Sequence, residues 1–366
     1  MYAGFWSTLP RPILGLSPMD GVTDQPYRWI QKKYGQPDVI FTEFTSAEGV
    51  SHNATKLFRD FLYEASERPV VAQIFGKDPE SFRTTALILG YLGFDGIDIN
   101  MGCPAKTVRQ HGSGAALIKT PELAKKLISA TQAGVQDWVD GRTLDDVPKL
   151  KEKTKKLVLE TFEKLPDSYK QRRPLPISVK TRIGYDHPMT EEWISTLLEM
   201  EIPVITVHGR TLMQMYTGQA NWEEIAKAVE LGHQAGTLIL GNGDIKDAET
   251  AQKRFEETGV DGFLIGRASF GDPSVLQKLR VWRDQKYQHI ETPALTQNPL
   301  QLAIEHSHQF EKAFPEEGFY PMRKHLAWYV RDFPNASDYR VALMQANNAQ
   351  EVEQILQPLL ASLSEK

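Results

Sequence analysis

The only cysteine among the 366 residues, Cys103, lies where an apolar run stops and a flexible segment begins. Phe94–Ile99 is typical of a short buried strand, and Gly102 and Pro104 then end it in an irregular loop. The glycine-rich run Gly112–Ala116 follows closely and permits close approach to a ligand. A free cysteine is more often a small buried hydrophobe. At the end of a buried strand beside such a loop, the thiol is also a candidate acid, nucleophile or substrate clamp.

Functional side chains stand at the ends of eight apolar runs in the first 270 residues. In chain order they are Met19, Glu43, Gln73, Asn100 with Cys103, Lys180 with Arg182, His208 with Arg210, Asn242, and Gly266 with Arg267. A single residue of this kind is ordinarily structural. A set at eight strand ends is better explained by one ligand bound where those ends meet.

Three of these residues indicate which charged and hydrogen-bonding groups the ligand carries. Lys180 lies within a buried strand, where an ammonium is costly unless it meets an anion such as a phosphate or the N1/O2 edge of a reduced flavin. Gln73 supplies both a donor and an acceptor, as a ring such as isoalloxazine requires. His208 is a candidate donor to a ring carbonyl or a partner of a phosphate.

The last two runs end in glycine-containing turns, at 241–244 and 265–268. Such turns expose backbone N–H groups, and Arg267 adds a cation beside them. The ordinary alternative is two tight turns without a ligand. Together with the arginine, the two turns favour a phosphate site.

The elements that must position these residues alternate between buried strands and helices. The strand-like runs are Ile13–Ser17, Val39–Glu43, Val70–Ile74, Gly96–Asn100, Ile177–Thr181, Val204–His208, Leu238–Asn242 and Gly262–Gly266. Continuous apolar runs separated by helical segments indicate a parallel sheet, and eight units in about 270 residues predict an α/β fold of the (β/α)8 TIM-barrel type. An open doubly wound sheet is the alternative, but no G-x-G-x-x-G follows the first run.

Two segments fall outside this alternation. An insertion near 135–174 carries the basic cluster Lys149–Lys156, which is either a solvated helix face or an RNA-contacting patch. After a linker at Pro293–Pro299, the pattern from Leu300 to Leu363 is helical. We therefore expect a barrel over residues 1–290 and a small α-helical C-terminal domain over 298–366.

Composition restricts the class of protein. A hydrophobic fraction of 41% and a charged fraction of 24% are ordinary for a soluble globular chain. One cysteine excludes an internal disulfide, and no secretory leader or membrane-spanning run is evident, so we expect a cytoplasmic protein. The net charge of −5 argues against indiscriminate nucleic-acid binding but permits a local basic face.

The motifs occur in the order found in the tRNA-dihydrouridine synthases, a family that this chain resembles. They are Pro18–Asp24, Gln73–Gly76, Asp98–Pro104, Gly112–Leu117, Val179–Gly184, Val207–Thr211, Gly241–Ile245 and Ile265–Ala268. The likeness extends from Pro12 to about Pro273. It resumes at Pro321–Tyr329, which is similar to that family's helical tRNA-binding domain.

The resemblance implies an FMN-dependent barrel that reduces the 5,6 double bond of uridine in tRNA, with a hydride to C6, a proton from Cys103 to C5, and NADPH as the reductant. The residues that it places at the flavin are Pro18, Met19, Asp20, Gln73, Lys180 and His208, with Asn242, Gly243, Asp244, Gly266 and Arg267 at its phosphate. The residues that it places at uracil or tRNA are Asn100, Lys106, Arg182, Arg210, Arg323, Lys324 and His325. It also implies a monomer without a metal or a membrane partner.

The insertion departs from the family pattern, because it is longer than the connection expected there. We expect neutralisation of Lys151, Lys153, Lys155 and Lys156 to weaken tRNA binding. Other functions stay open at this point: a flavin barrel acting on a free pyrimidine, a flavin-free phosphosugar lyase or isomerase in which Lys180 forms a Schiff base or binds phosphate, and a catalytically silent RNA-binding protein.

Overall fold

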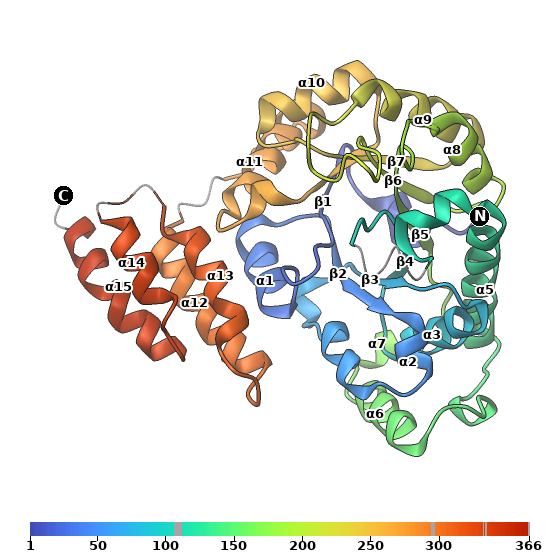
Figure 1. The fold of residues 1–366 in the computed structure, drawn as a ribbon, viewed down its shortest axis with the longest axis horizontal. Coiled ribbons are helices and arrows are strands. Elements are labelled where there is room, and N and C mark those ends of the chain that lie inside the picture. The colour runs from blue at the N-terminus through green and yellow to red at the C-terminus, as the bar shows by residue number, and fades with distance from the viewer. Residues whose placement is uncertain (106–111, 294–296, 332, 334, 365–366) are drawn as a thin grey trace.

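Eight parallel strands form a closed barrel in the computed structural model, which describes residues 1–105, 112–293, 297–331, 333 and 335–364. Each strand pairs with the next in chain order, and the last pairs with the first (Figure 1). The strands are β1 (Ile13–Leu16), β2 (Val39–Ser46), β3 (Val70–Phe75), β4 (Gly96–Met101), β5 (Ile177–Arg182), β6 (Val204–His208), β7 (Leu238–Asn242) and β8 (Gly262–Ile265). The predicted TIM barrel is confirmed.

Helices surround the barrel on its outside (Figure 1). They are α1 (Gln25–Ile30), α2 (Ala47–Ser51), α3 (Pro79–Tyr91), α5 (Pro121–Val139), α8 (Thr190–Leu198), α9 (Trp222–Ala235), α10 (Ala248–Thr258) and α11 (Ser274–Arg283). Side chains at strand exits cap several of them: Asp24 caps α1, Asp78 caps α3, Asn221 caps α9 and Asp247 caps α10. The protein itself therefore satisfies these helix N-termini.

The two ends of the barrel interior differ in polarity. Near the starts of the strands the interior is filled by a fully buried apolar cluster that includes Trp6, Ile13, Val39, Phe41, Val71, Val204, Leu240 and Leu264. This plug closes one end, so a ligand has access only from the end where the strands finish, which we call the mouth. The known functional face of such barrels is the same end.

The insertion contains two helices joined by short turns. Helix α5 continues to Val139 and buries Val135 and Trp138, so the inserted segment begins later than position 135. It contains α6 (Glu152–Glu163) and α7 (Asp167–Lys170), and α6 packs against α3. Helix α6 lies on the outside of the barrel (Figure 1).

The C-terminal helices share a hydrophobic core of their own. They are α12 (Pro299–Ala313), α13 (Tyr320–Tyr329), α14 (Ala336–Leu343) and α15 (Ala349–Ser364). They reach the barrel through α1, which packs on α12, and through ion pairs such as Lys312–Glu64, 2.8 Å apart. The exact boundary between two domains stays a prediction. No helix in the described part of the chain is both long and apolar enough to cross a membrane.

Candidate active site

A hydrogen-bonded set of polar side chains lines the mouth side of β3, β4 and β5. Gln73 Nε2 donates to Asp98 at 2.7 Å, and Ser178 Oγ donates to the other carboxylate oxygen at 2.6 Å. Asn100 Nδ2 donates to Gln73 Oε1 at 2.9 Å. Because these bonds cross from strand to strand, the side chains share the barrel interior. The structure thus brings the predicted Gln73 and Asn100 together and adds Asp98, which fixes the orientation of the Gln73 amide.

The Cys103 loop is held from two sides. Asn100 Oδ1 accepts the backbone N–H groups of Gly102 at 3.0 Å and Cys103 at 2.9 Å. Arg182 Nε donates to the carbonyl of Gly102 at 2.7 Å. Cys103 is only 9% exposed, and burial raises the pKa of its thiol, which therefore stays protonated at neutral pH. The arrangement presents an immobilised proton-bearing thiol at the mouth.

Lys180 places a buried ammonium in the same interior. It is in register with Asn100 on β4 and Thr206 on β6, and its Nζ donates to Asn242 Oδ1 at 3.2 Å. Burial, and then the charge of Arg182, lower the pKa of Lys180 to about 8, which leaves it mainly cationic at pH 7. The Thr206 hydroxyl is buried without a hydrogen-bond partner among the described residues. A buried cation with one neutral acceptor and an unpaired hydroxyl both suit a polar ligand.

Arg210 binds the protein rather than facing solvent. Its Nη2 lies 2.9 and 2.8 Å from the two Asp244 carboxylate oxygens and 2.6 Å from the carbonyl of Gly218. Burial, and then neighbouring cations, lower the pKa of His208 far below its usual value, so the neutral ring accepts from Arg210 Nη1 at 3.3 Å. The side chain of Arg210 is 3% exposed and joins the loops after β6 and β7, and its contact with substrate stays a prediction.

The loops after β7 and β8 present backbone donors without acceptors. In the described part of the chain, no acceptor meets the N–H groups of Gly243, Asp244, Gly266 or Arg267. Gly243 has φ of +121°, and a Cβ there would lie 3.1 Å from the His208 ring, so a larger residue would distort this turn. The Arg267 side chain is 56% exposed beside them. Free N–H groups with an adjacent guanidinium suit a phosphate.

Two further segments reach the mouth. Residues Pro18–Asp20 follow β1, and Met19 Sδ lies 3.5 Å from the position that a Cβ on Gly266 would take. Lys324 on α13 brings its Nζ within 3.3 Å of the corresponding position on Gly21. One C-terminal helix therefore carries a cation to the rim of the mouth, while the contact of Lys324 with tRNA stays a prediction.

The other predicted RNA contacts on α13 have structural roles. His325 is fully buried against Tyr27 and His306, so the prediction that it contacts RNA is wrong. Arg323 donates to the carbonyl of Ala346 and to Asn347 Oδ1, both at 2.9 Å, and so ties α13 to the segment after α14. The predicted substrate residue Lys106 lies outside the described residues.

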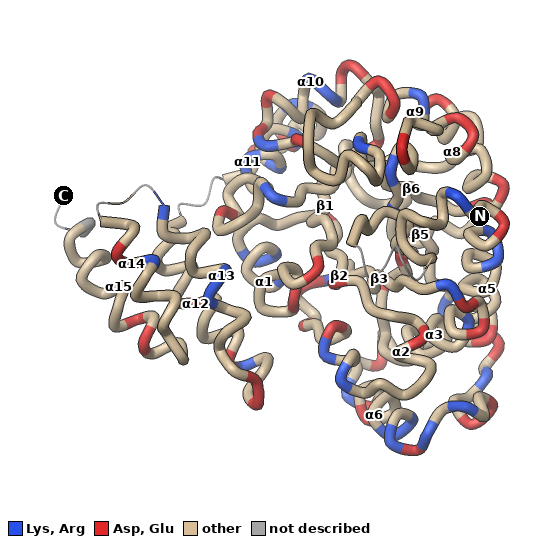
Figure 2. Tube along the Cα trace, in the orientation of Figure 1, with Lys and Arg blue, Asp and Glu red and all other residues tan. Residues whose placement is uncertain are grey.

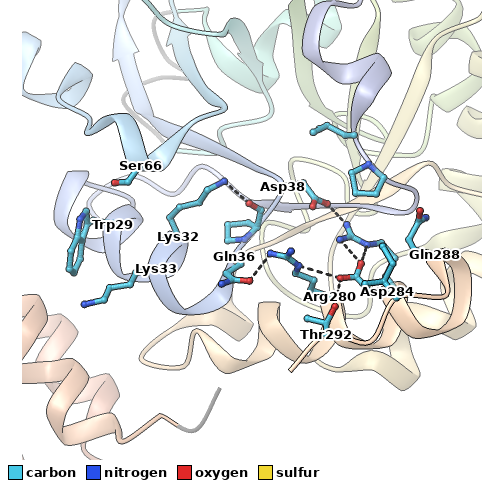
Figure 3. A pocket seen from close by; sticks show the side chains of 15 residues that line it. Trp29, Lys32, Lys33, Gln36, Asp38, Ser66, Arg280, Asp284, Gln288 and Thr292 are labelled. Carbon is cyan, nitrogen blue, oxygen red and sulfur yellow. Dashed lines mark hydrogen bonds and ion pairs between the residues drawn. The ribbon is translucent and has the colours of Figure 1, made fainter. Parts of the chain in front are cut away.

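One cavity lies at the opposite end of the barrel from the mouth. It measures about 860 Å³ and lies between residues that precede β1 and β2 and residues within and after α11 (Figure 3). Arg283 pairs with Asp38 and Asp284, and Arg280 donates to Gln36 at 2.6 Å. Because its charged groups mainly satisfy one another, we assign the candidate site to the mouth.

Comparison of the chain with known proteins shows the family to which it belongs. The family model described as dihydrouridine synthase (Dus) matches residues 15–143 and 153–364. This chain belongs to the dihydrouridine synthase family. It is 33% identical over 361 residues to "Probable tRNA-dihydrouridine synthase 2" of Bacillus subtilis (strain 168), covering 97% of this chain and 96% of that protein. It is 31% identical over 370 residues to "Probable tRNA-dihydrouridine synthase" of Staphylococcus aureus (strain COL), covering 100% and 98%.

The resemblance inferred from motif order is confirmed by these matches. The dihydrouridine synthase model leaves residues 144–152 unmatched, and this stretch lies within the insertion.

Proposed function

We propose that this protein reduces uridine in tRNA to 5,6-dihydrouridine, with FMN bound in the mouth and NADPH as the reductant. The observation that carries the proposal is the combination of a buried thiol, a buried ammonium and acceptor-free backbone N–H groups around one opening. The names of the relatives from Bacillus and Staphylococcus point to the same substrate.

The donor set suits FMN at two places. Lys180, Gln73 and Asn100 would hold the polar edge of the isoalloxazine ring, since together they offer a cation and amide donors and acceptors. The backbone N–H groups of the loops after β7 and β8, with Arg267, would hold the phosphate. When bound and reduced, FMN supplies the hydride that is added to C6 of the uracil ring.

Cys103 would supply the second hydrogen. Negative charge develops on the ring as C6 gains a hydride, and C5 must then take up a proton. The S–H bond of Cys103 breaks as the C5–H bond forms, and the thiolate regains its proton from solvent. The raised pKa of the buried thiol keeps this proton in place until then. Arg182 and Asn100 serve as positioning residues, because both bind the loop that carries the thiol.

The substrate uridine lies within a folded RNA, so the base must leave its stack to reach the barrel interior. Contacts with the RNA outside the mouth have to supply that free energy. Lys324 on α13 is one candidate contact, because it stands at the rim of the mouth. We propose that the C-terminal helices bind tRNA as a unit and that a monomer suffices.

Nucleoside mass spectrometry of unmodified tRNA, incubated with the protein, FMN and NADPH, tests the proposal. We expect a two-dalton gain on uridine that Cys103→Ala abolishes or slows at least about 100-fold, the usual contribution of a positioned acid. Flavin bound with NADPH oxidised but no gain on tRNA would indicate a free pyrimidine or another substrate. A colourless protein without flavin would favour the phosphosugar barrel.

A further inference from the structure

A group of exposed lysines lies at the rim of the mouth, next to the insertion. We call Lys56, Lys77, Lys149 and Lys151 the rim lysines. All four are exposed, and within 4.0 Å none forms an ion pair with another described residue. They come from three segments of the chain, and Lys149 and Lys151 lie within the stretch that the family model leaves unmatched.

Hydrogen bonds hold these three segments together. Asn53, just after α2, donates to the carbonyl of Lys149 at 2.9 Å and accepts from the N–H of Lys151 at 2.7 Å. Lys56 follows three residues later in the same segment. Glu48 on α2 accepts from the N–H of Lys77 at 2.6 Å. The segments that carry the four side chains are therefore fixed beside one another at the exits of β2 and β3.

The carboxylates nearby are hydrogen-bonded within the protein. Hydrogen bonds from Ser81 lower the pKa of Asp78, and Lys149 lies close enough to help lower the pKa of that carboxyl group. Asp78 caps α3 by accepting from Ser81, and Glu48 accepts backbone N–H groups. Asp145 and Glu152 both pair with Lys155, which is only 13% exposed. Figure 2 shows basic and acidic positions interspersed around α6. These carboxylates stay charged, but among the described residues none forms an ion pair with a rim lysine, so the four exposed ammonium groups stay available to an external anion.

The rim lysines and the C-terminal helices flank different parts of the mouth. Lys324 stands beside the loop after β1, whereas the rim lysines follow β2 and β3 and include the insertion. Figure 1 shows α6 beside α2 and α3, away from α12–α15. An anionic partner that contacts both groups must lie across the mouth, as an extended polyanion does and a small metabolite does not.

We propose that the rim lysines form a second RNA-binding surface, which binds the phosphate backbone on the side of the mouth away from the C-terminal helices. This inference rests on the proposed function and deepens it. The rim lysines and the C-terminal helices would bind the RNA on either side of one opening while the target base is extruded between them. Lysines bind phosphates as point charges, so the contact adds affinity without reading sequence.

The test replaces all four rim lysines by glutamine. A matched control replaces Lys126, Lys164, Lys253 and Lys278, which lie on the outer helices or at the end of α6, and so makes the same change in net charge. Binding of unmodified tRNA is measured by filter retention between 50 and 200 mM KCl. Flavin content and melting temperature show that each variant is folded.

We expect the rim variant to bind more weakly and with a shallower salt dependence. Loss of two to four phosphate contacts lowers the slope of log K against log salt by about 1.5 to 3. The loss of affinity over that fourfold salt range then shrinks by about 8- to 60-fold relative to the parent. The control variant should keep a slope within about 0.5 of the parent.

Two outcomes overturn the inference: a rim variant with the salt slope and the affinity for tRNA of the parent, or a control variant that loses as much slope. Either result, with dihydrouridine still formed by the parent, leaves the proposed function standing. If the parent itself neither binds tRNA nor forms dihydrouridine, the proposed function fails, and the rim inference fails with it.

Discussion

Replacement of His325 by phenylalanine should make the protein less sensitive to acid. His325 and His306 lie where the C-terminal helices meet α1, with ring centroids 4.9 Å apart and Tyr27 against both. Both are fully buried, and neither ring nitrogen of His325 has a hydrogen-bond partner among the described residues. Burial lowers the pKa of His306 to about 3 and that of His325 well below its usual value.

The magnitude follows from proton linkage. In the unfolded chain each histidine has a pKa of about 6.5, so below that pH the unfolded state binds protons that the native state does not. Stability is therefore fully present above pH 6.5 and is lost as pH falls toward the native pKa. Between pH 7 and pH 5 each buried histidine costs about 2 kcal/mol of unfolding free energy. The parent should lose about 2 kcal/mol more than His325→Phe over this interval.

Urea unfolding followed by tryptophan fluorescence at pH 7 and pH 5 measures this difference. Each protein is compared with itself at pH 7, so any packing cost of the larger ring cancels. An exposed control, His52→Phe, should behave like the parent. Equal losses of stability in the parent and in His325→Phe would refute the reasoning, because His325 would then titrate alike in the folded and unfolded chains.

Three further predictions concern the barrel. Burial, and then the nearby carboxylates of Asp24, Asp60 and Asp20, raise the pKa of Glu43 to about 8, so the free energy of unfolding falls as pH rises from 4.5. Between pH 6 and pH 8 the parent should lose about 2 kcal/mol more of this free energy than Glu43→Gln in the same urea assay. Glu67→Ala leaves the fully buried Arg28 without its ion-pair partner and should cost about 3–5 kcal/mol of unfolding free energy, measured by denaturation at pH 7. Gly243→Ala strains a turn at φ +121° and should weaken FMN binding at least about 10-fold in a fluorescence titration, while the melting temperature changes little.

The strands were predictable because both of their faces are buried. A strand of this kind is a continuous apolar run, and all eight runs became strands with ends that shift by at most a few residues. The end of α5 was harder to predict. Gly134 resembles a helix breaker, but its missing Cβ lets α3 approach, since a Cβ there would lie 2.2 Å from the carbonyl of Arg83. The sequence alone does not distinguish a glycine that ends a helix from a glycine that lets two helices pack closely.

Strand ends located much of the candidate site, and alternation along a strand would have added Asp98. Side chains two positions apart share a face, so Asp98 necessarily points with Asn100 into the barrel. Arg210 and His325 could not be judged in this way. Their burial depends on Asp244 and Tyr27, which are distant in the chain and come close only in the folded barrel.

The acidic net charge of −5 does not weigh against RNA binding once the fold is known. Carboxylates such as Asp78 cap helices around the mouth, and Asp145 pairs with Lys155, so the distribution of charge over the surface, and not its sum, decides where an anion can bind. The basic run of the insertion shows the same principle from the other side: Lys155 is paired and largely buried, whereas Lys151 is exposed and unpaired among the described residues. Lys77 is more than 70 positions away from Lys151 in the chain, yet the proposal places these two lysines in one surface and leaves the neighbouring Lys155 out of it. Which charges face a partner is decided by local pairing, which a sum over the sequence cannot express.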